Sequence, residues 1–359
     1  MPVKFKHCLP LLRLAVPAAI LTYLIYSVAS NPDQVANLRL IFSGGTRWYL
    51  IGLAFLVALA ALTITILRWY LLVITLGLPF TLVGALRLGF LGYLLNFVGV
   101  GGVGGDLFKA IILARQQMER RAEAFATVVV DRLIGLYSLL VVTALVSLTI
   151  DFQTASLIVQ TGARAVRVCA VVGTIMGGLM LMPGFSNGSF SEFLVGLPKV
   201  GSAFQRVMDA IRLYRGRPDV LALIGVMSLM VHILFAFSVY CVAHGVFPVA
   251  PTYAEMLIIS PMAMVFAAIP IAPGGLGTLE LALSYLYTQV PAESFTEGEG
   301  LSTALGFRAI TIGLAFIGAL FYWLNRDTVQ SAYRDVEQEQ DQQEKPSANE
   351  NSPISAESE

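Results

Sequence analysis

Two sets of acidic and basic residues interrupt apolar stretches of this sequence, and they are its best candidates for chemistry. In the first set, Asp131 and Arg132 are adjacent within one apolar run, and Asp106 and Lys109 stand about one helical turn apart upstream. In a membrane helix, such a charge costs roughly 2.5–3.5 kcal/mol at the centre and less near the interface. Residues that are so costly to bury are typical of a site that binds an anionic or zwitterionic group and rearranges around it. A static ion pair that locks helices together is the alternative.

Glu280 and Arg308 form the corresponding set in the second half of the chain. Adjacent residues of a helix point about 100° apart, so Asp131 and Arg132 do not face each other as residues three or four positions apart do. We therefore expect their partners in the upstream turn that carries Asp106. In the same way, we expect Glu280 to pair with Arg308.

Two glycine-rich loops lie next to these charges, and a phosphate would suit them. The loops contain Gly101, Gly102, Gly104 and Gly105 in the first half, and Gly274, Gly275 and Gly277 in the second. Glycine lets the backbone take positive φ and approach a ligand closely, and a helix start beside it presents N–H groups to an anion. The first loop lacks the Gly-Lys-Ser/Thr ending of a nucleotide-binding P-loop. Close packing of helices through small residues is the alternative.

Neither a metal site nor a cofactor site is predicted. Cys8, Cys169 and Cys241 are odd in number and have unrelated spacings, so they indicate neither metal binding nor a disulfide framework. His232 lies near the middle of an apolar run, with no acidic residue within a helical turn. We expect this histidine to hydrogen-bond to a neighbouring helix, and a proton-relay role is the alternative.

The composition indicates a membrane protein. Hydrophobic residues make up 57% of the 359 residues and charged residues 13%, whereas a soluble globular chain has roughly 25% charged residues. So few charges could not cover the surface of a soluble domain of this size. The net charge is zero, and no nucleic-acid partner is expected. We predict an all-α polytopic membrane protein whose partners are the bilayer and a lipid or lipid-linked substrate.

Six stretches are candidates to cross the bilayer, which takes about 20 apolar residues. They are Leu11–Ser30, Trp48–Leu67, Phe125–Ile150, Ala165–Pro183, Val220–Val246 and Ser302–Leu324. Two further apolar stretches are broken. Leu82–Val98 runs into the first glycine-rich loop. Met256–Ala272 carries two prolines, meets the second loop and resumes to about Val290. We predict that each broken stretch is a re-entrant helical hairpin, and that the two hairpins enter from opposite sides.

The distribution of Lys and Arg favours a cytoplasmic N-terminus. With both hairpins re-entrant, thirteen bases fall on the cytoplasmic side, Arg68 and Lys109 among them, and four fall outside, Arg164 and Arg167 among them. Making only the first break a full span would move a basic loop outside and spoil this bias. We therefore predict a multi-pass protein of the plasma (inner) membrane with both termini in the cytoplasm.

The predicted elements of the two halves have the same order and opposite directions. Residues 1–150 read as span, span, hairpin and span, and residues 151–326 repeat this order inverted, before a disordered, acidic cytoplasmic tail at 327–359. From Gly104 to Arg132 is 28 residues, and from Gly277 to Arg308 is 31. Inverted repeats with broken helices near the midplane are the architecture of many secondary transporters. We predict such a repeat, and chance coincidence of short motifs is the alternative.

At these residues the sequence resembles the flippase-like family named for the transmembrane region of lysylphosphatidylglycerol synthase. Three motifs carry the resemblance, which covers almost the whole chain to about residue 326. They are Gly101-Gly102-Val103-Gly104-Gly105-Asp106 with Lys109, Val130-Asp131-Arg132-Leu133, and Ala272-Pro273-Gly274-Gly275-Leu276-Gly277 with Glu280. The resemblance implies a bacterial or archaeal membrane protein that translocates lipids or lipid-linked molecules, or supports their synthesis.

Two features depart from the family's pattern. Val100 stands where the family often has proline, and Lys109 stands where it often has arginine. A lysine meets a phosphate as a point charge, without the bidentate fork of arginine. No soluble aminoacyl-transferase domain follows the last predicted span, so we do not expect synthesis of an aminoacylated lipid.

These features favour a flippase-like transporter in which a headgroup binds between the hairpins and the two halves rock about it. We predict no catalytic residue. The first alternative is an intramembrane enzyme acting on lipid or polyprenyl phosphates, for which Asp106 and Asp131 are the only plausible metal pair of the first half. The second alternative is a scaffold for a lipid-modifying enzyme. A homo-oligomer is compatible with each of these functions.

Overall fold

The computed structural model describes the chain in eight segments, and every element discussed below lies in them. The described residues are 45–98, 104–117, 119–149, 156–181, 212, 214–268, 275–290 and 294–324. Within these segments the chain forms helices joined by turns, and no strand is present. The predicted first span Leu11–Ser30 and the predicted tail 327–359 lie outside the described residues.

Five helices of the described segments are long and apolar enough to cross a membrane. They are α3 (Trp48–Thr75), α6 (Arg121–Val146), α7 (Leu157–Leu181), α10 (Pro218–Val246) and α13 (Glu297–Leu324). Four shorter helices form two consecutive pairs. The first pair is α4 (Leu82–Val98) and α5 (Gly104–Gln116), and the second is α11 (Tyr253–Ala267) and α12 (Thr278–Gln289). The protein is therefore a multi-pass α-helical membrane protein.

The observed helix ends differ from those predicted. α3 continues past Leu67, so Arg68 lies inside a helix, and α7 begins before Ala165, so Arg164 and Arg167 also lie inside a helix. Apolarity alone set the predicted ends, whereas a helix keeps its backbone hydrogen bonds through a charged residue whose side chain finds a partner. The excess of bases on the predicted cytoplasmic side remains after these residues are removed from the two counts.

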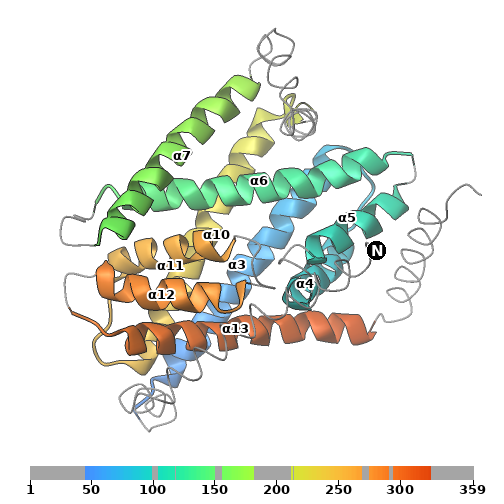
Figure 1. Cartoon of the computed structure of the whole chain (residues 1–359). Helices are drawn as coiled ribbons and strands as arrows, with labels where there is room; N and C mark the ends of the chain where they lie inside the picture. Colours follow the sequence, from blue (N-terminus) through green and yellow to red (C-terminus); the bar gives the residue numbers. More distant parts are fainter. Residues whose placement is uncertain are drawn as a thin grey trace, which may run out of the picture.

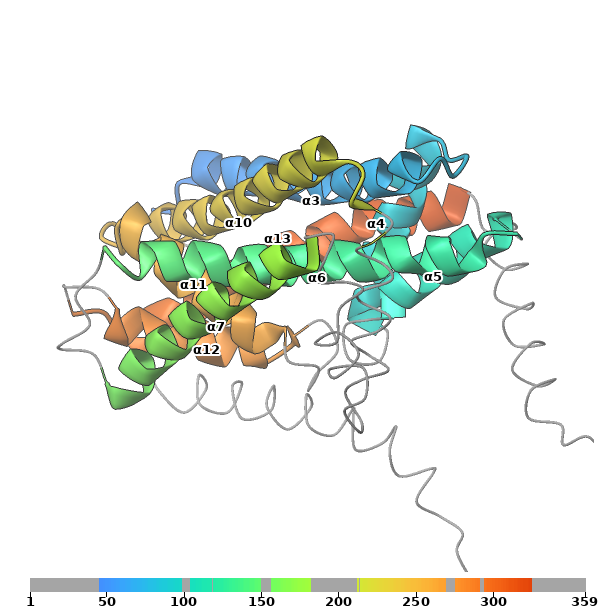
Figure 2. The ribbon, with the colours of Figure 1, turned by 90° about the horizontal axis from the view of Figure 1, so that it is seen from above.

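α3 and α10 form an antiparallel pair held together through small side chains. Ala54, Ala58 and Ala61 of α3 are fully buried, and Ser238 of α10 donates a hydrogen bond to the carbonyl oxygen of Ala54 at 2.8 Å. Small residues let membrane helices approach closely, which favours van der Waals contact where lipid provides no hydrophobic force. Seen from above, the two helices lie side by side along one face of the molecule (Figure 2).

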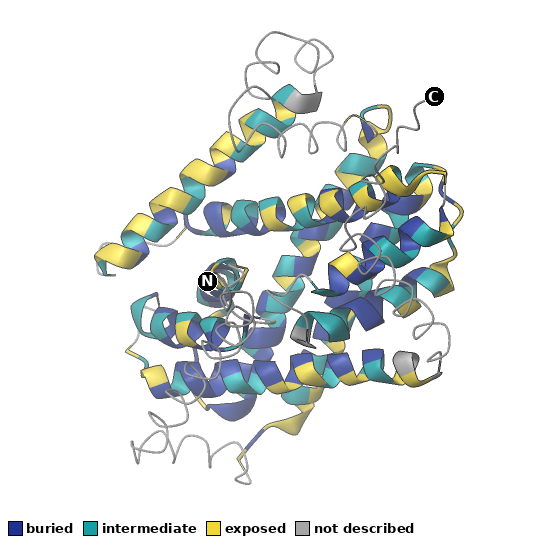
Figure 3. Cartoon of the chain, turned by 45° about the vertical axis from the view of Figure 1, so that its right-hand side comes forward, coloured by how far each residue is buried: buried dark blue, intermediate teal, exposed yellow. Residues whose placement is uncertain are grey.

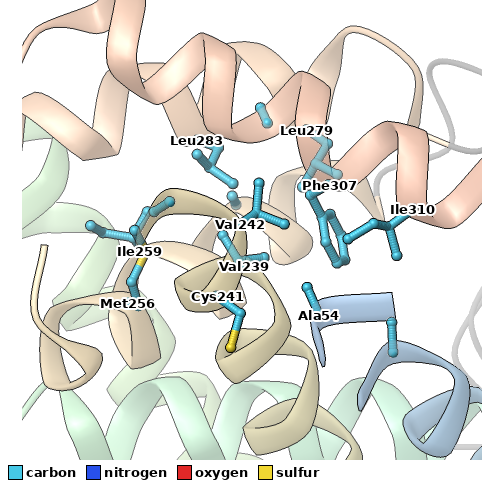
Figure 4. Close-up of a cluster of buried hydrophobic side chains, with 14 of the residues drawn as sticks. Ala54, Val239, Cys241, Val242, Met256, Ile259, Leu279, Leu283, Phe307 and Ile310 are labelled. Carbon is cyan, nitrogen blue, oxygen red and sulfur yellow. The ribbon is translucent and has the colours of Figure 1, made fainter. Parts of the chain in front are cut away.

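The main apolar core joins this pair to the second hairpin and to α13. Val242 of α10 lies close to Leu279 and Leu283 of α12 and to Phe307 of α13 (Figure 4). Exposed residues lie on the outer faces of the helices (Figure 3), and many of the exposed side chains are large and apolar. Exposed apolar surface of this extent marks contact with a membrane. Trp48 at the start of α3 is also exposed, as expected of an aromatic residue at the membrane interface.

The two short helix pairs lie at opposite ends of the space between α6 and α13 (Figure 1). α6 begins at the end occupied by α4 and α5, and α13 begins at the end occupied by α11 and α12, so the two long helices run in opposite directions (Figure 1). The order of the helices along the chain explains these opposite directions, because α5 leads into α6 at one end and α12 leads into α13 at the other.

Contacts between helices come in corresponding sets. α3 packs on α4 as α10 packs on α11, α4 on α5 as α11 on α12, and α5 on α6 as α12 on α13. The contacts between the halves correspond too, because α4 packs on α13 and α11 packs on α6. At the first of these, Gly318 of α13 lies so close to α4 that an added Cβ atom would be 2.3 Å from the Phe90 carbonyl oxygen. Exchanging α3–α6 with α10–α13 leaves this pattern of contacts unchanged.

Candidate functional site

Asp106 lies between two cations at the start of α5. The Nζ atom of Lys109 is 2.7 Å from its Oδ1 atom, and Arg132 of α6 binds its Oδ2 atom. The Lys109 ammonium also lies over the Trp69 ring, 5.1 Å from the ring centroid, where the face of the ring attracts a cation. Asp106 and Lys109 are buried, so cations and not water compensate the carboxylate. The predicted pairing of Arg132 with the upstream turn is confirmed.

Asp131 is held by Arg68 of α3. The Nε atom of Arg68 donates to Oδ1 of Asp131 at 2.8 Å, and Nη2 donates to the Asp131 carbonyl oxygen at 3.2 Å. The Nη1 atom of Arg68 donates to Oγ of Ser228 at 2.8 Å, so one guanidinium group joins α3, α6 and α10. The prediction that Asp131 bonds to the upstream turn is therefore wrong, because Asp131 and Arg132 face different neighbours of α6.

Arg68 is the residue that sequence reasoning missed, since we expected it in a cytoplasmic segment. It is buried well inside α3. Two signals in the sequence point to this position. The apolar run resumes after Arg68 for more than a turn, with Trp69 and Leu72, and Asp131 needs a buried cation that no residue of its own helix face provides.

We name Arg68, Asp106, Lys109, Asp131 and Arg132 the first cluster. Its charges act on one another across three helices. The charge of Arg68 acts on both Lys109 and Arg132, and the charge of Asp131 acts on Lys109. The cluster is therefore one electrostatic unit, and a change at one member alters the others.

Glu280 of α12 and Arg308 of α13 form the second pair, as predicted. The Nε atom of Arg308 donates to Oε1 of Glu280 at 2.5 Å, and its Nη2 atom donates to the Gly275 carbonyl oxygen at 3.1 Å. The other carboxylate oxygen of Glu280 accepts the N–H of Gly277 at 2.8 Å. The ion pair thus holds the second glycine-rich loop against α13. Both charged side chains are buried.

Arginine and carboxylate stand at equivalent places in the two halves. Asp106 is the third residue of α5, and Glu280 is the third residue of α12. Arg132 and Arg308 each stand eleven positions after the first residue of their long helix. At 1.5 Å per residue, that is about 17 Å along the helix axis, close to the middle of a hydrocarbon core of about 30 Å.

The described glycines of the two loops already serve the fold. An added Cβ atom at Gly105 would lie 1.7 Å from the Gly92 carbonyl oxygen, so α4 and α5 cross in backbone contact there. Gly275 and Gly277 have φ values of 65° and 82°, a region that glycine adopts without strain. The N–H of Gly105 donates to Oδ1 of Asn96 at 2.9 Å, and that of Gly277 is taken by Glu280, so neither faces an anion in this structure.

The other predicted residues fall into two groups. Gly104 begins α5, whereas Gly101, Gly102 and Gly274 lie outside the described residues. His232 shares a hydrogen bond of 3.0 Å between its Nε2 atom and the Gly135 carbonyl oxygen of α6. This contact confirms the predicted bond to a neighbouring helix. Within the part of the chain that the structure describes, no three His, Cys, Asp or Glu side chains lie together as in a metal site.

A comparison with known protein families shows which family the chain belongs to. A family model described as the lysylphosphatidylglycerol synthase TM region matches residues 11–319. The chain belongs to this family. The match includes every residue of the first cluster and of the second pair, and it confirms the resemblance that the three motifs indicated. No curated protein and no solved structure matches the chain. Membership in this membrane protein family makes a role related to membrane lipids plausible.

Proposed function

We propose that this protein is a flippase-like transporter of the plasma membrane that moves a lipid or lipid-linked headgroup across the bilayer by alternating access. The observation that carries the proposal is the equivalence of two carboxylate–arginine contacts, Asp106 with Arg132 and Glu280 with Arg308. Each contact joins the second helix of a hairpin to the long helix that follows it. Charged contacts at equivalent places of two halves fit alternating access, in which one repeat rocks against the other about a site near the bilayer midplane.

The proposal includes an inverted repeat of α3–α6 and α10–α13. It is supported by the opposite directions of α6 and α13 (Figure 1) and by a pattern of helix contacts that survives exchange of the halves. The proposed orientation has the start of α6 in the cytoplasm and the start of α13 outside, as the bias of Lys and Arg favours.

Single cysteines test this orientation. Cys8, Cys169 and Cys241 are first replaced by serine, and Glu119→Cys and Glu297→Cys are then made separately, because both positions are exposed. An impermeant thiol reagent added to intact cells should label Glu297→Cys, and it should label Glu119→Cys only after lysis. Labelling of both from the same side would contradict the inverted repeat.

Lipid movement tests the function itself. The full chain is reconstituted in vesicles with a phospholipid that carries a chemically quenchable headgroup label. We expect faster loss of the protected label than in protein-free vesicles, and Asp106→Asn should remove most of that acceleration. Asp219→Asn is the matched control, because Asp219 forms an exposed ion pair with Arg217 and belongs to neither the first cluster nor the second pair. Equal rates with and without protein would refute transport, and chemical alteration of the lipid would favour the intramembrane enzyme.

A further inference from the structure

A cavity of about 710 Å³ lies between α6, α7 and α10. α6 packs on both of the other helices, and α7 is inclined to α6 (Figure 1). The α6 wall of the cavity is a single stripe of the helix, because its residues recur three and four positions apart. They are Val130, Leu133, Ile134, Tyr137, Ser138 and Val141. At 1.5 Å per residue, this stripe is about 16 Å long, so the cavity has one long wall.

Glycines open the other two walls. Gly177 and Gly178 of α7 and Gly225 of α10 line the cavity, and no atom of the described residues lies within 4 Å of a Cβ atom added to any of them. α7 nevertheless touches α6 nearby, where a Cβ atom added to Gly173 would be 3.1 Å from the ring of Tyr137. The space therefore exists because side chains are missing at these glycines, although the helices themselves are in contact.

The hydroxyl groups at the cavity already have partners within the protein. Thr174 donates to a carbonyl oxygen of its own helix at 2.8 Å, so Tyr137 is the donor in their shared hydrogen bond of 2.6 Å. Tyr214 donates to a carbonyl oxygen of α3 at 3.1 Å. Each of these hydroxyl groups has one hydrogen to donate, and none is left for a ligand. The described residues of the lining include no charged side chain, so the cavity is not suited to a phosphate or a carboxylate.

A hydrocarbon chain suits this cavity. Protein interiors have few voids larger than a water molecule, and a buried water needs several polar partners, which the lining does not offer. The three helices are long and apolar enough to cross a membrane, so hydrocarbon is the medium around them. The α6 wall of about 16 Å is close to half of a hydrocarbon core of about 30 Å, which is the depth of one leaflet and of one acyl chain. A polyprenyl carrier chain is longer than one leaflet.

We infer that the cavity between α6, α7 and α10 binds one acyl chain of a membrane phospholipid and recognises the chain but not the headgroup. The binding comes from van der Waals contact along the walls, because the surrounding lipid is as apolar as the cavity and provides no hydrophobic force. The inference goes beyond the proposed function and does not depend on it, since the bound lipid can be one that is moved or one that stays in place.

Photocrosslinking of the full chain tests the inference. The protein is reconstituted in phosphatidylcholine vesicles that contain a small fraction of phosphatidylcholine with a diazirine in the middle of one acyl chain. After irradiation and digestion, mass spectrometry locates the labelled residues. We expect labels on the α6 wall, at Tyr137 above all, and also at outer residues such as Phe316, which is 70% exposed. Labelling of Phe316 without labelling of the wall would overturn the inference, because another part of this chain or a second copy would then cover the cavity.

Substitutions of the open glycines link the label to the cavity. Gly178→Phe and Gly225→Phe place a ring in the open space from two different walls. Each should lower the labelling of the α6 wall, and the double variant should lower it about tenfold, because a ring and a chain in the same space would be overpacked. Labelling of Phe316 should stay unchanged in all of them. Unchanged labelling of the wall in the double variant would contradict the inference.

Gly52→Phe is the matched control. An added Cβ atom at Gly52 also has no atom of the described residues within 4 Å, and Gly52 is not part of the lining. This variant should keep the wild-type labelling of the α6 wall. Thermal unfolding of each variant shows that it is folded.

Two comparisons identify the ligand. Phosphatidylglycerol with the same photoreactive chain should label the wall as strongly as phosphatidylcholine does, and a strong preference for either headgroup would overturn recognition by the chain alone. Unlabelled phosphatidylcholine should suppress the labelling of the wall. Suppression by undecaprenyl phosphate at a lower mole fraction would overturn the acyl chain in favour of a polyprenyl chain. Labelling requires no lipid movement, so its outcome is separate from that of the transport assay.

Discussion

The first cluster and the second pair occupy equivalent places, yet they differ in composition and in exposure. Arg132 shares Asp106 with Lys109, and its side chain is 42% exposed. Arg308 has Glu280 together with the Gly275 carbonyl oxygen, and its side chain is 9% exposed. One arginine is thus held by a carboxylate that has a second cation, and the other is enclosed with its carboxylate and a loop.

This difference shows how one motif can have two roles within one structure. A carboxylate with two cations can release one of them without becoming an uncompensated charge, whereas a carboxylate with one cation cannot. Asp106 therefore keeps a compensating cation if Arg132 moves away, whereas the second pair holds its loop against α13.

The largest effect should come from breaking the second pair. Glu280→Ala removes the carboxylate that compensates the buried guanidinium group of Arg308, and we expect the free energy of unfolding to fall by about 3–5 kcal/mol. Denaturant unfolding in detergent micelles measures this. Asp219→Ala, in an exposed ion pair, is the control. The double variant Glu280→Leu with Arg308→Leu should recover most of the loss, and wild-type stability of Glu280→Ala alone would contradict an enclosed pair.

Arg68→Gln should destabilise the protein less, by about 1.5–3 kcal/mol, the range for hydrogen bonds to charged groups. The effect is smaller because Asp131 still interacts with the charge of Lys109. The same unfolding experiment measures it. A loss of stability greater than that of Glu280→Ala would mean that Lys109 does not stabilise Asp131. Asp131 would then depend on a single cation, as Glu280 does.

The next largest loss of stability should come from a change at the crossing of α4 and α5. Gly105→Ala forces α4 away from α5, because the new methyl group would overlap the Gly92 carbonyl oxygen, and we expect a loss of about 1–3 kcal/mol from overpacking. Gly52→Ala is the matched control, since no atom lies within 4 Å of the position of its added Cβ atom. Equal stability of the two variants would indicate that the first hairpin can open at no cost.

Arg132→Gln should have the smallest effect on stability, at most about 1 kcal/mol, because its side chain is partly exposed and Asp106 keeps Lys109. Its effect on lipid movement should nevertheless be large. Unfolding and transport assays on the same preparation compare the two effects, with Arg308→Gln as the counterpart that loses stability. If Arg132→Gln were as unstable as Arg308→Gln, both arginines would act by stabilising the fold.

Much of the fold could be predicted because a membrane leaves few solutions. Apolar length located the described spans, and breaks at glycine and proline located both short helix pairs. The boundaries could not be predicted equally well. Arg68 looked like the end of a span because its compensating groups, Asp131 and Ser228, are 63 and 160 residues away along the chain. Hydropathy gives the cost of burying a charge at one position of the sequence. The groups that offset this cost are known only from the folded structure.

The candidate site, too, could be predicted from the sequence only in part. Glu280 and Arg308 were paired from their equivalent positions, and Arg132 was correctly assigned to the turn of Asp106. The partner of Asp131 was not found, because the neighbours of each face of α6 depend on helix packing. Whether Gly105 serves ligand binding or helix packing was also undecided, because a glycine beside a ligand and a glycine at a helix crossing look alike in sequence.

By itself, the sequence determined that the chain is a polytopic membrane protein, that it belongs to its family, and which residues other than Arg68 carry buried charge. Composition and motif spacing suffice for these properties, because the cost of a charge in hydrocarbon depends on residue type. Only the tertiary structure decided which cation meets which carboxylate, that Lys109 and Arg132 share Asp106, and that Arg132 is accessible while Arg308 is enclosed. Those properties depend on distances between helices that are far apart in sequence, and packing sets those distances.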